Sequence, residues 1–185
     1  MSLRNTKQSY GSISKGFHWG VGLLVLIVLG IGLVMTLLME PSPDMFALYK
    51  WHKQLGIVVL AFVVLRLLWR FTEVRPDSLQ QGVLDKIARF VHLLLYVCIL
   101  ALPLSGWAMS SAKGYDVNLF GVYTLPNFVS KNKELGDFLG EMHFYVGYTL
   151  LASFLLHFAG ALKHAFIDKD DTLKRMLPFC SKGNK

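Results

Sequence analysis

Residues 143–157 read HFYVGYTLLASFLLH, an apolar segment that begins and ends with a histidine and contains no Asp, Glu, Lys or Arg. A helix advances about 100° and 1.5 Å per residue, so fourteen residues return to nearly the same face about 21 Å further along the axis. The stretch therefore predicts a membrane-spanning helix that presents two imidazoles to the same neighbours at two depths.

The rest of the chain also has the composition of a membrane protein. Of its 185 residues, 54% are hydrophobic and 17% are charged, which is too apolar for an ordinary soluble domain. Three uncharged runs are each long enough to cross a hydrocarbon core of about 30 Å, and a fourth apolar segment is interrupted only at its ends and by Arg66. We therefore predict an all-α, four-helix transmembrane bundle that forms one domain over residues 1–185. Its predicted spans are 16–39, 49–71, 89–112 and 142–164.

The Lys and Arg residues that flank these segments predict their orientation. Thirteen fall on the side of the two termini, against five on the other side. Because basic loops stay in the cytoplasm, we expect both termini to be cytoplasmic. The net charge of +7 then indicates topology and attraction to anionic lipid, and not a nucleic-acid partner. The first span follows a basic leader, but its apolar run is longer than that of a cleavable signal peptide, so we interpret it as an anchor.

Six histidines lie within or at the edge of a predicted span. An ionisable group in hydrocarbon costs about 3 kcal/mol or more unless it faces the bundle interior with a partner. A single such histidine would be interpreted as a neutral imidazole bonded to a neighbouring helix. Six of them, with almost no carboxylates in the membrane, favour a ligand role for at least four. The six are His18, His52, His92, His143, His157 and His164.

The depths of these histidines can be compared because successive helices alternate in direction. His52 and His143 both open spans that start on the outer side, so they are expected at one level. His18 starts the first span from the inner side, and His157 lies about 21 Å inward of His143 by helical rise. These two are expected to meet near the inner leaflet, although by depth alone His164 competes with His157.

Two pairs of facing histidines indicate haem. An iron whose equatorial positions are filled by a porphyrin needs two axial ligands from opposite sides, and imidazoles supply them. Gly22, Gly56 and Gly147 each follow a proposed ligand by four residues, and Gly160 follows His157 closely. A flat macrocycle needs such cleared helix surface, whereas small-residue helix packing is the alternative explanation. The pattern predicts two haems b, one above the other.

Several short motifs are distributed over the whole chain. They are "HW" at His18–Trp19, "WHKQLG" around His52, "RLLWR" at the end of the second span, "ALPLSGWAMSSA" in the third, the His143/His157 pair, and "KDDTLKRMLP" after the fourth. With these motifs the chain resembles the bacterial cytochrome b561 family. The resemblance implies a four-helix bundle with two haems b. It also implies the axial ligands, His52 with His143 for the outer haem and His18 with His157 for the inner, and so decides between His157 and His164.

Members of this family pass electrons between the outer side and membrane quinone. The resemblance therefore implies a multi-pass protein of the bacterial inner membrane, with lipid, ubiquinone and a periplasmic electron donor as partners. Some members resemble a superoxide:ubiquinone oxidoreductase, and we expect that activity here. The alternative is an electron-transfer cytochrome b subunit that links a hydrogenase or dehydrogenase in the periplasm to the quinone pool. A histidine-lined transporter would need acidic or broken-helix sites near mid-membrane, which the sequence lacks.

Three further side chains and a pair of lysines are candidates for supporting roles. Arg66 lies fourteen residues after His52, at the inner level, where it meets haem propionates or snorkels to the inner surface. His92 and His164, on the inner side, are candidates for binding quinone and relaying protons, or are simply buried. Lys50 and Lys53 flank His52 and would attract an anion such as superoxide, although the outer loops together carry about −1 net charge.

Overall fold

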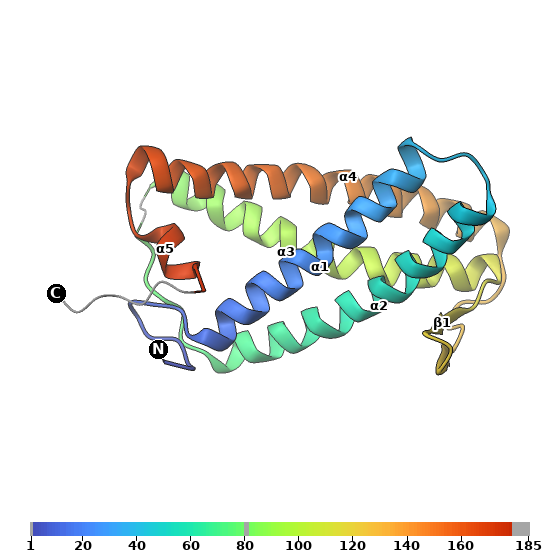
Figure 1. Cartoon of the computed structure of the whole chain (residues 1–185), viewed down its shortest axis with the longest axis horizontal. Coiled ribbons are helices and arrows are strands. Elements are labelled where there is room, and N and C mark those ends of the chain that lie inside the picture. The colour runs from blue at the N-terminus through green and yellow to red at the C-terminus, as the bar shows by residue number, and fades with distance from the viewer. Residues whose placement is uncertain (1, 80–81, 179–185) are drawn as a thin grey trace.

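A computed structural model of the chain describes residues 2–79 and 82–178. Four of its helices are long and apolar enough to cross a membrane, and they lie along one axis as an elongated bundle (Figure 1). Among the described residues, the elements are the helices α1 (Ser12–Leu37), α2 (Pro43–Thr72), α3 (Val83–Lys113) and α4 (Lys133–Lys163), the strands β1 (Val117–Leu119) and β2 (Tyr123–Leu125), the π-helix η1 (His164–Asp168) and the short helix α5 (Thr172–Met176).

The predicted all-α bundle with four spans is confirmed. Each long helix begins earlier than its predicted span, at residues 12, 43, 83 and 133, because polar first turns continue the helix beyond the hydrocarbon. Two of these starts have side-chain caps. Ser42 accepts a hydrogen bond from the Met45 amide (3.2 Å) and is followed by Pro43, a residue favoured at the first helical position. Asn132 accepts one from the Leu135 amide (2.9 Å).

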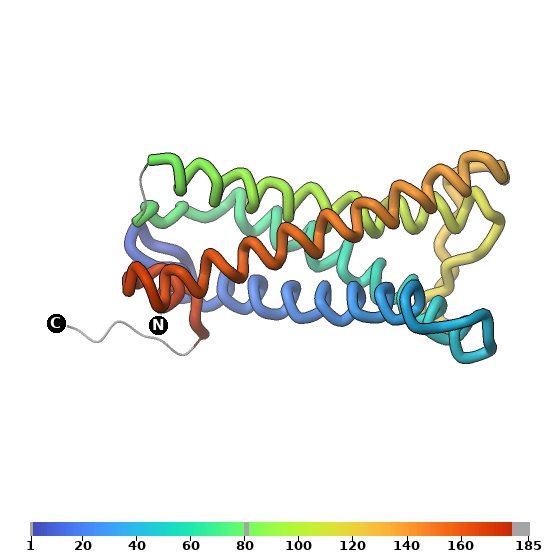
Figure 2. Tube along the Cα trace, turned by 90° about the horizontal axis from the view of Figure 1, so that it is seen from above, coloured from blue at the N-terminus to red at the C-terminus, as the bar shows by residue number. Residues whose placement is uncertain are grey.

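The helices pack as neighbouring pairs. α3 lies along α4, α1 lies along α2, and α2 also contacts α3, as the two perpendicular views show (Figures 1 and 2). The α1–α2 loop and the β-hairpin lie at one end of the bundle, and both ends of the described chain lie at the other (Figure 1). α2 and α4 therefore both start at the hairpin end, which brings their first turns to the same level.

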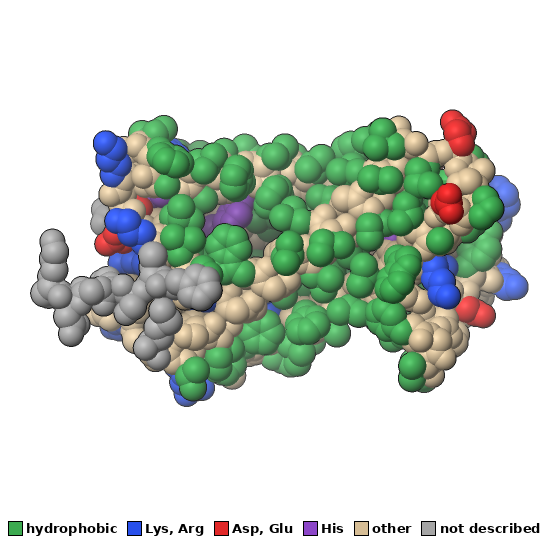
Figure 3. Space-filling view, viewed as in Figure 1, with side chains coloured by type: hydrophobic (Ala, Val, Ile, Leu, Met, Phe, Trp, Pro, Cys, Tyr) green, Lys and Arg blue, Asp and Glu red, His purple; other side chains and the backbone are tan. Residues whose placement is uncertain are grey.

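The outside of the bundle is apolar along its middle. On the face that Figure 3 shows, hydrophobic side chains cover most of that region, whereas most charged side chains gather at the two ends. Leu23, Leu93 and Leu156 are each more than 60% exposed. The buried core is small in comparison and consists of Val21, Val59, Val63, Cys98, Ile99 and Leu150. An apolar exterior around a small core is the pattern of a protein whose solvent is lipid.

The β-hairpin was not predicted from the sequence, because strands of three residues are too short to show an alternating pattern. β1 and β2 are antiparallel. Their turn contains Phe120 and Gly121, which both have positive φ (53° and 79°), and the Asn118 side chain accepts a hydrogen bond from the Gly121 amide (2.7 Å). The buried Gln54 side chain of α2 donates to the Asn118 carbonyl (3.0 Å). The hairpin is thereby fixed to α2 beside His52.

Candidate functional site

His52 from α2 and His143 from α4, the two histidines expected on the outer side, lie ring to ring. Their ring centroids are 6.0 Å apart and their planes are inclined by 75°. Both residues are partly buried, and both lie in the half of the bundle that carries the hairpin. The structure thus brings together the two histidines that the depth comparison placed at one level.

Hydrogen bonds fix the orientation of both outer rings. The Nδ1 atom of His52 lies 3.1 Å from the Val28 carbonyl oxygen. A carbonyl only accepts, so Nδ1 is protonated and Nε2 keeps its lone pair. The Nδ1 atom of His143 lies 3.0 Å from the Ser105 hydroxyl, which itself donates to the Leu102 carbonyl (3.0 Å). Both rings therefore have the tautomer that a metal-binding histidine needs, held by a second partner.

Two glycines make room for these rings. A Cβ atom on Gly32 of α1 would lie 3.2 Å from Cε1 of His52, and one on Gly106 of α3 would lie 3.1 Å from Cε1 of His143. Any larger residue would have to displace the imidazole. Our sequence reasoning missed both glycines, because it looked for small residues only on the ligands' own helices.

The histidines expected on the inner side form a second group at the other end of the bundle. The His18 and His157 rings have centroids 6.1 Å apart and planes inclined by 64°. The His92 ring from α3 lies closer to His157, with a centroid distance of 5.0 Å. Its Nδ1 atom lies 2.7 Å from the Ala88 carbonyl oxygen, which leaves its Nε2 free. The inner site therefore contains three imidazoles instead of two.

Arg66 is the charged residue of the inner group. Its Nη2 atom lies 3.4 Å from Nδ1 of His18, and its guanidinium lies over the Tyr96 ring, 5.4 Å from the centroid. Arg66 was expected at the level of the His18 and His157 pair, and it lies beside His18. Its contact with the ring of His18 was not expected.

The separation of the rings in each histidine pair would allow both imidazoles to bind one iron. An imidazole nitrogen binds a first-row metal at about 2.0–2.1 Å, so two rings on opposite sides of one metal have centroids about 6 Å apart. The observed 6.0 and 6.1 Å agree with this value. The glycines singled out in the sequence also fit, since a Cβ atom on any of them would meet no atom within 4 Å; they are Gly22, Gly56, Gly147 and Gly160.

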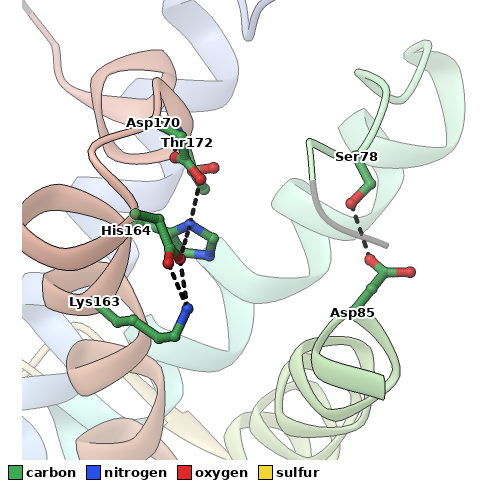
Figure 4. A network of polar contacts seen from close by, with 7 residues as sticks. Ser78, Asp85, Lys163, His164, Asp170 and Thr172 are labelled. Atoms are coloured by element: carbon green, nitrogen blue, oxygen red, sulfur yellow. Dashed lines mark hydrogen bonds and ion pairs between the residues drawn. The ribbon is translucent and has the colours of Figure 1, made fainter. Parts of the chain in front are cut away.

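His164 lies apart from both pairs, in η1. Its Nδ1 atom lies 2.7 Å from an Asp170 carboxylate oxygen, and Asp170 also accepts from the Thr172 amide (2.8 Å) (Figure 4). The neighbouring Lys163 forms an ion pair with Asp168 (2.6 Å). His164 therefore belongs to a polar network after the fourth span, whereas His92 lies against an inner histidine.

The outer surface beside His52 carries two lysines. Lys50, Trp51, Gln54 and Phe120 line an open cavity of about 290 Å³. The Lys53 ammonium donates to the Asp116 carbonyl (3.3 Å) and lies 5.7 Å from the centre of the Tyr115 ring. Lys53 is thus held against the segment before the hairpin and Lys50 lines the cavity, and both flank His52 in the sequence.

A four-helix membrane bundle with histidine pairs at two depths is the architecture of a membrane electron-transfer protein. The chain belongs to the prokaryotic cytochrome b561 family, whose model matches residues 9–179. It is 36% identical over 179 residues to cytochrome b561 homolog 2 of Escherichia coli (strain K12), and the matched region covers 96% of this chain and 95% of the relative. It is 31% identical over 169 residues to cytochrome b561 homolog 1 of the same organism, covering 87% and 92% of the two chains. It is 25% identical over 173 residues to the probable superoxide oxidase CybB of Yersinia pestis, covering 92% and 97%.

Membership of this family confirms the resemblance to the bacterial cytochrome b561 family that the sequence motifs indicated. The protein is a multi-pass membrane cytochrome of the b561 type, and its cofactor is b-type haem.

Proposed function

We propose that the chain binds two haems b and carries electrons across the membrane from superoxide on the outer side to ubiquinone. The proposal rests on two pairs of imidazole rings, His52 with His143 and His18 with His157. The distance between the rings of each pair would suit two axial ligands of one haem iron. When bound, haem supplies a one-electron carrier at each level. With the sites about 20 Å apart by helical rise, the two carriers would connect the two faces of the bilayer.

At the outer face the chain's own contribution is charge. Two superoxide anions would each give up one electron and leave as dioxygen. Lys50 and Lys53 lie beside the outer pair and would raise the local concentration of an anion. One relative carries the name of a probable superoxide oxidase, which supports superoxide as the donor.

At the inner face the chain would supply protons. A quinone that accepts two electrons takes up two protons to become a quinol. The Nδ1 atom of His92 faces a carbonyl, so its Nε2 keeps a lone pair beside the His157 ring, and the mostly buried His164 is hydrogen-bonded to Asp170 after the fourth span. We propose that His92 contacts the quinone and that His164 relays protons, so that replacing either with Ala leaves the haem spectrum intact and slows electron exchange with quinone.

The first test is the haem content of the purified chain. We expect two low-spin haems b per chain by the pyridine haemochrome assay, one haem after His157→Ala, and two after His164→Ala. A single haem in the unmodified chain would contradict the proposal. One haem after His164→Ala, with two after His157→Ala, would make His164 the inner ligand.

The second test concerns the donor. Stopped-flow mixing of the oxidised protein with superoxide should reduce the haems at a rate that falls with ionic strength, since charges at the surface are screened beyond about 8–10 Å at physiological salt. Neutralising Lys50 and Lys53 together should flatten that dependence. A rate no faster than that of an unrelated di-haem cytochrome would favour instead the electron-carrying subunit of a periplasmic dehydrogenase or hydrogenase.

A further inference from the structure

We infer that Arg66 raises the reduction potential of the inner haem above that of the outer haem by placing a fixed positive charge against His18. The inference rests on the proposed assignment of His18 and His157 to the inner haem. It concerns the direction of electron flow within the chain, and not the identity of the donor or acceptor.

Arg66 lies over an aromatic ring that a second arginine also contacts. Its guanidinium lies 5.4 Å from the centroid of the Tyr96 ring. Arg70, one turn further along α2, lies 5.1 Å from the same centroid and donates to the Tyr96 hydroxyl (3.0 Å). Arg66 is partly buried, and in the part of the chain that the structure describes no ion pair joins it to a carboxylate. Within the described chain, no carboxylate side chain therefore offsets this charge beside His18.

The proposed outer haem site has oxygen acceptors beside its histidines, where the inner site has a positive charge. The Nδ1 atoms of His52 and His143 face a carbonyl and a hydroxyl oxygen, of Val28 and Ser105. Oxygen acceptors at this atom make an imidazole a better electron donor to its metal, which stabilises oxidised iron. At His18 the Nδ1 atom lies 3.4 Å from the Arg66 guanidinium and not from an oxygen acceptor. When Nε2 binds iron, Nδ1 carries a proton, so the guanidinium then acts on the ring as a nearby charge and not as a hydrogen-bond donor.

The sign of the effect follows from the charge on the iron. Oxidation adds one positive charge to the site, and a nearby cation opposes that addition, so the reduced form is favoured. The effect of a partly buried charge is also less weakened by salt than that of a surface charge. The inner haem should thus have the higher potential, and electrons entering at the outer haem would move inward downhill.

The test is the spectroelectrochemistry of the purified, haem-loaded full chain with chemical mediators, which requires neither superoxide nor quinone. We expect two midpoint potentials. Arg66→Gln should lower the higher one and leave the lower one unchanged, whereas Arg66→Lys should retain most of the higher value. Ser105→Ala, which removes the acceptor at His143, should raise only the lower one and so assign it to the outer haem.

Arg70→Gln is the matched control. It removes a guanidinium from the same helix that also lies over Tyr96, but for which no contact with His18 is seen among the described residues, so it should shift the higher potential less than Arg66→Gln does. If Arg66→Gln loses haem, Tyr96→Leu can be measured in its place. This substitution removes the ring over which Arg66 lies, and it should also lower the higher midpoint potential. The inference is overturned if Arg66→Gln leaves both potentials unchanged, raises one, or shifts the same haem as Ser105→Ala. A chain that binds no haem pair would overturn the proposed function instead.

Discussion

His143 shows how closely a single residue of the site is constrained. Its Nδ1 atom is 3.0 Å from the Ser105 hydroxyl, and its Cε1 atom lies so close to Gly106 that a Cβ there would approach to 3.1 Å. The ring can therefore neither rotate nor shift toward α3 without losing a hydrogen bond or meeting the backbone. On another side the ring faces His52, its partner in the pair that we assign to the outer haem.

Gly147 provides a test of that space. A Cβ on Gly147 would meet no atom within 4 Å, so Gly147→Leu should not disturb the packing of the protein by itself. If the outer macrocycle lies there, the variant should bind about half as much haem as the unmodified chain, with unchanged helix content by circular dichroism. Gly20→Leu, at an equally open but exposed position, should retain the full haem content. Full haem content in Gly147→Leu would place the macrocycle elsewhere.

At the scale of elements, the inner end of the bundle is closed by segments that are distant in sequence. The indole of Trp19, next to His18, donates to the Met176 carbonyl (2.8 Å), and the buried Lys15 donates to the Leu177 carbonyl (2.9 Å). Arg175 donates to the Asp77 carbonyl (2.9 Å) in the α2–α3 connection. α5 therefore fastens the first turns of α1, and with them His18, to the end of the chain.

Asp170 holds α5 in place, and because its carboxylate is charged, the stability of this attachment depends on pH. Burial pushes the pKa of Asp170 upward, but hydrogen bonds from Thr172 and His164 outweigh it, so the pKa lies below the ordinary value for a carboxyl. A carboxyl with a lowered pKa adds stability that is complete above its unfolded pKa and is lost as the pH falls through the folded pKa. At neutral pH the full contribution should be present.

Asp170→Ala should therefore loosen α5 at neutral pH. Loss of a charge-assisted hydrogen bond costs about 1.5 kcal/mol, roughly a tenfold change in an opening equilibrium. Hydrogen exchange of residues 172–177 should accelerate by about that factor. Asp171→Ala, which removes only an exposed ion pair with Lys174, should change exchange little. Equal acceleration in both variants would mean that Asp170 has no special role.

At the scale of the whole molecule, charge and hydrophobicity are separated along the bundle axis. Charged side chains lie at the two ends and hydrophobic ones between them (Figure 3). The end that carries the two termini has the larger number of Lys and Arg residues in the sequence, which predicts that it faces the cytoplasm.

Single-cysteine labelling tests this orientation. The native thiols are first removed; Cys98 is buried, and Cys180 lies outside the described residues. In intact cells with a permeable outer membrane, a membrane-impermeant maleimide should label Val122→Cys, whose parent side chain is 89% exposed in the hairpin. Thr6→Cys, near the N terminus, should be labelled only after the inner membrane is broken. The reverse pattern would invert the topology and place the proposed superoxide face inside.

The sequence by itself determined the helices and the facing of the histidines. Backbone groups in lipid must be satisfied within a helix, so uninterrupted apolar runs were enough to predict four spans. A fixed helical period then brought His143 and His157 to one face, and alternating directions paired them in depth with His52 and His18.

Only the tertiary structure decided what surrounds these histidines. Contacts such as Val28 with His52, Gly106 with His143, and Arg66 with His18 join different helices. No periodic signal within one segment encodes them, because they depend on how far each helix is rotated and shifted against its neighbours. The same reason explains why the sequence could name His92 as an inner-side residue but not its place beside His157, 5.0 Å away.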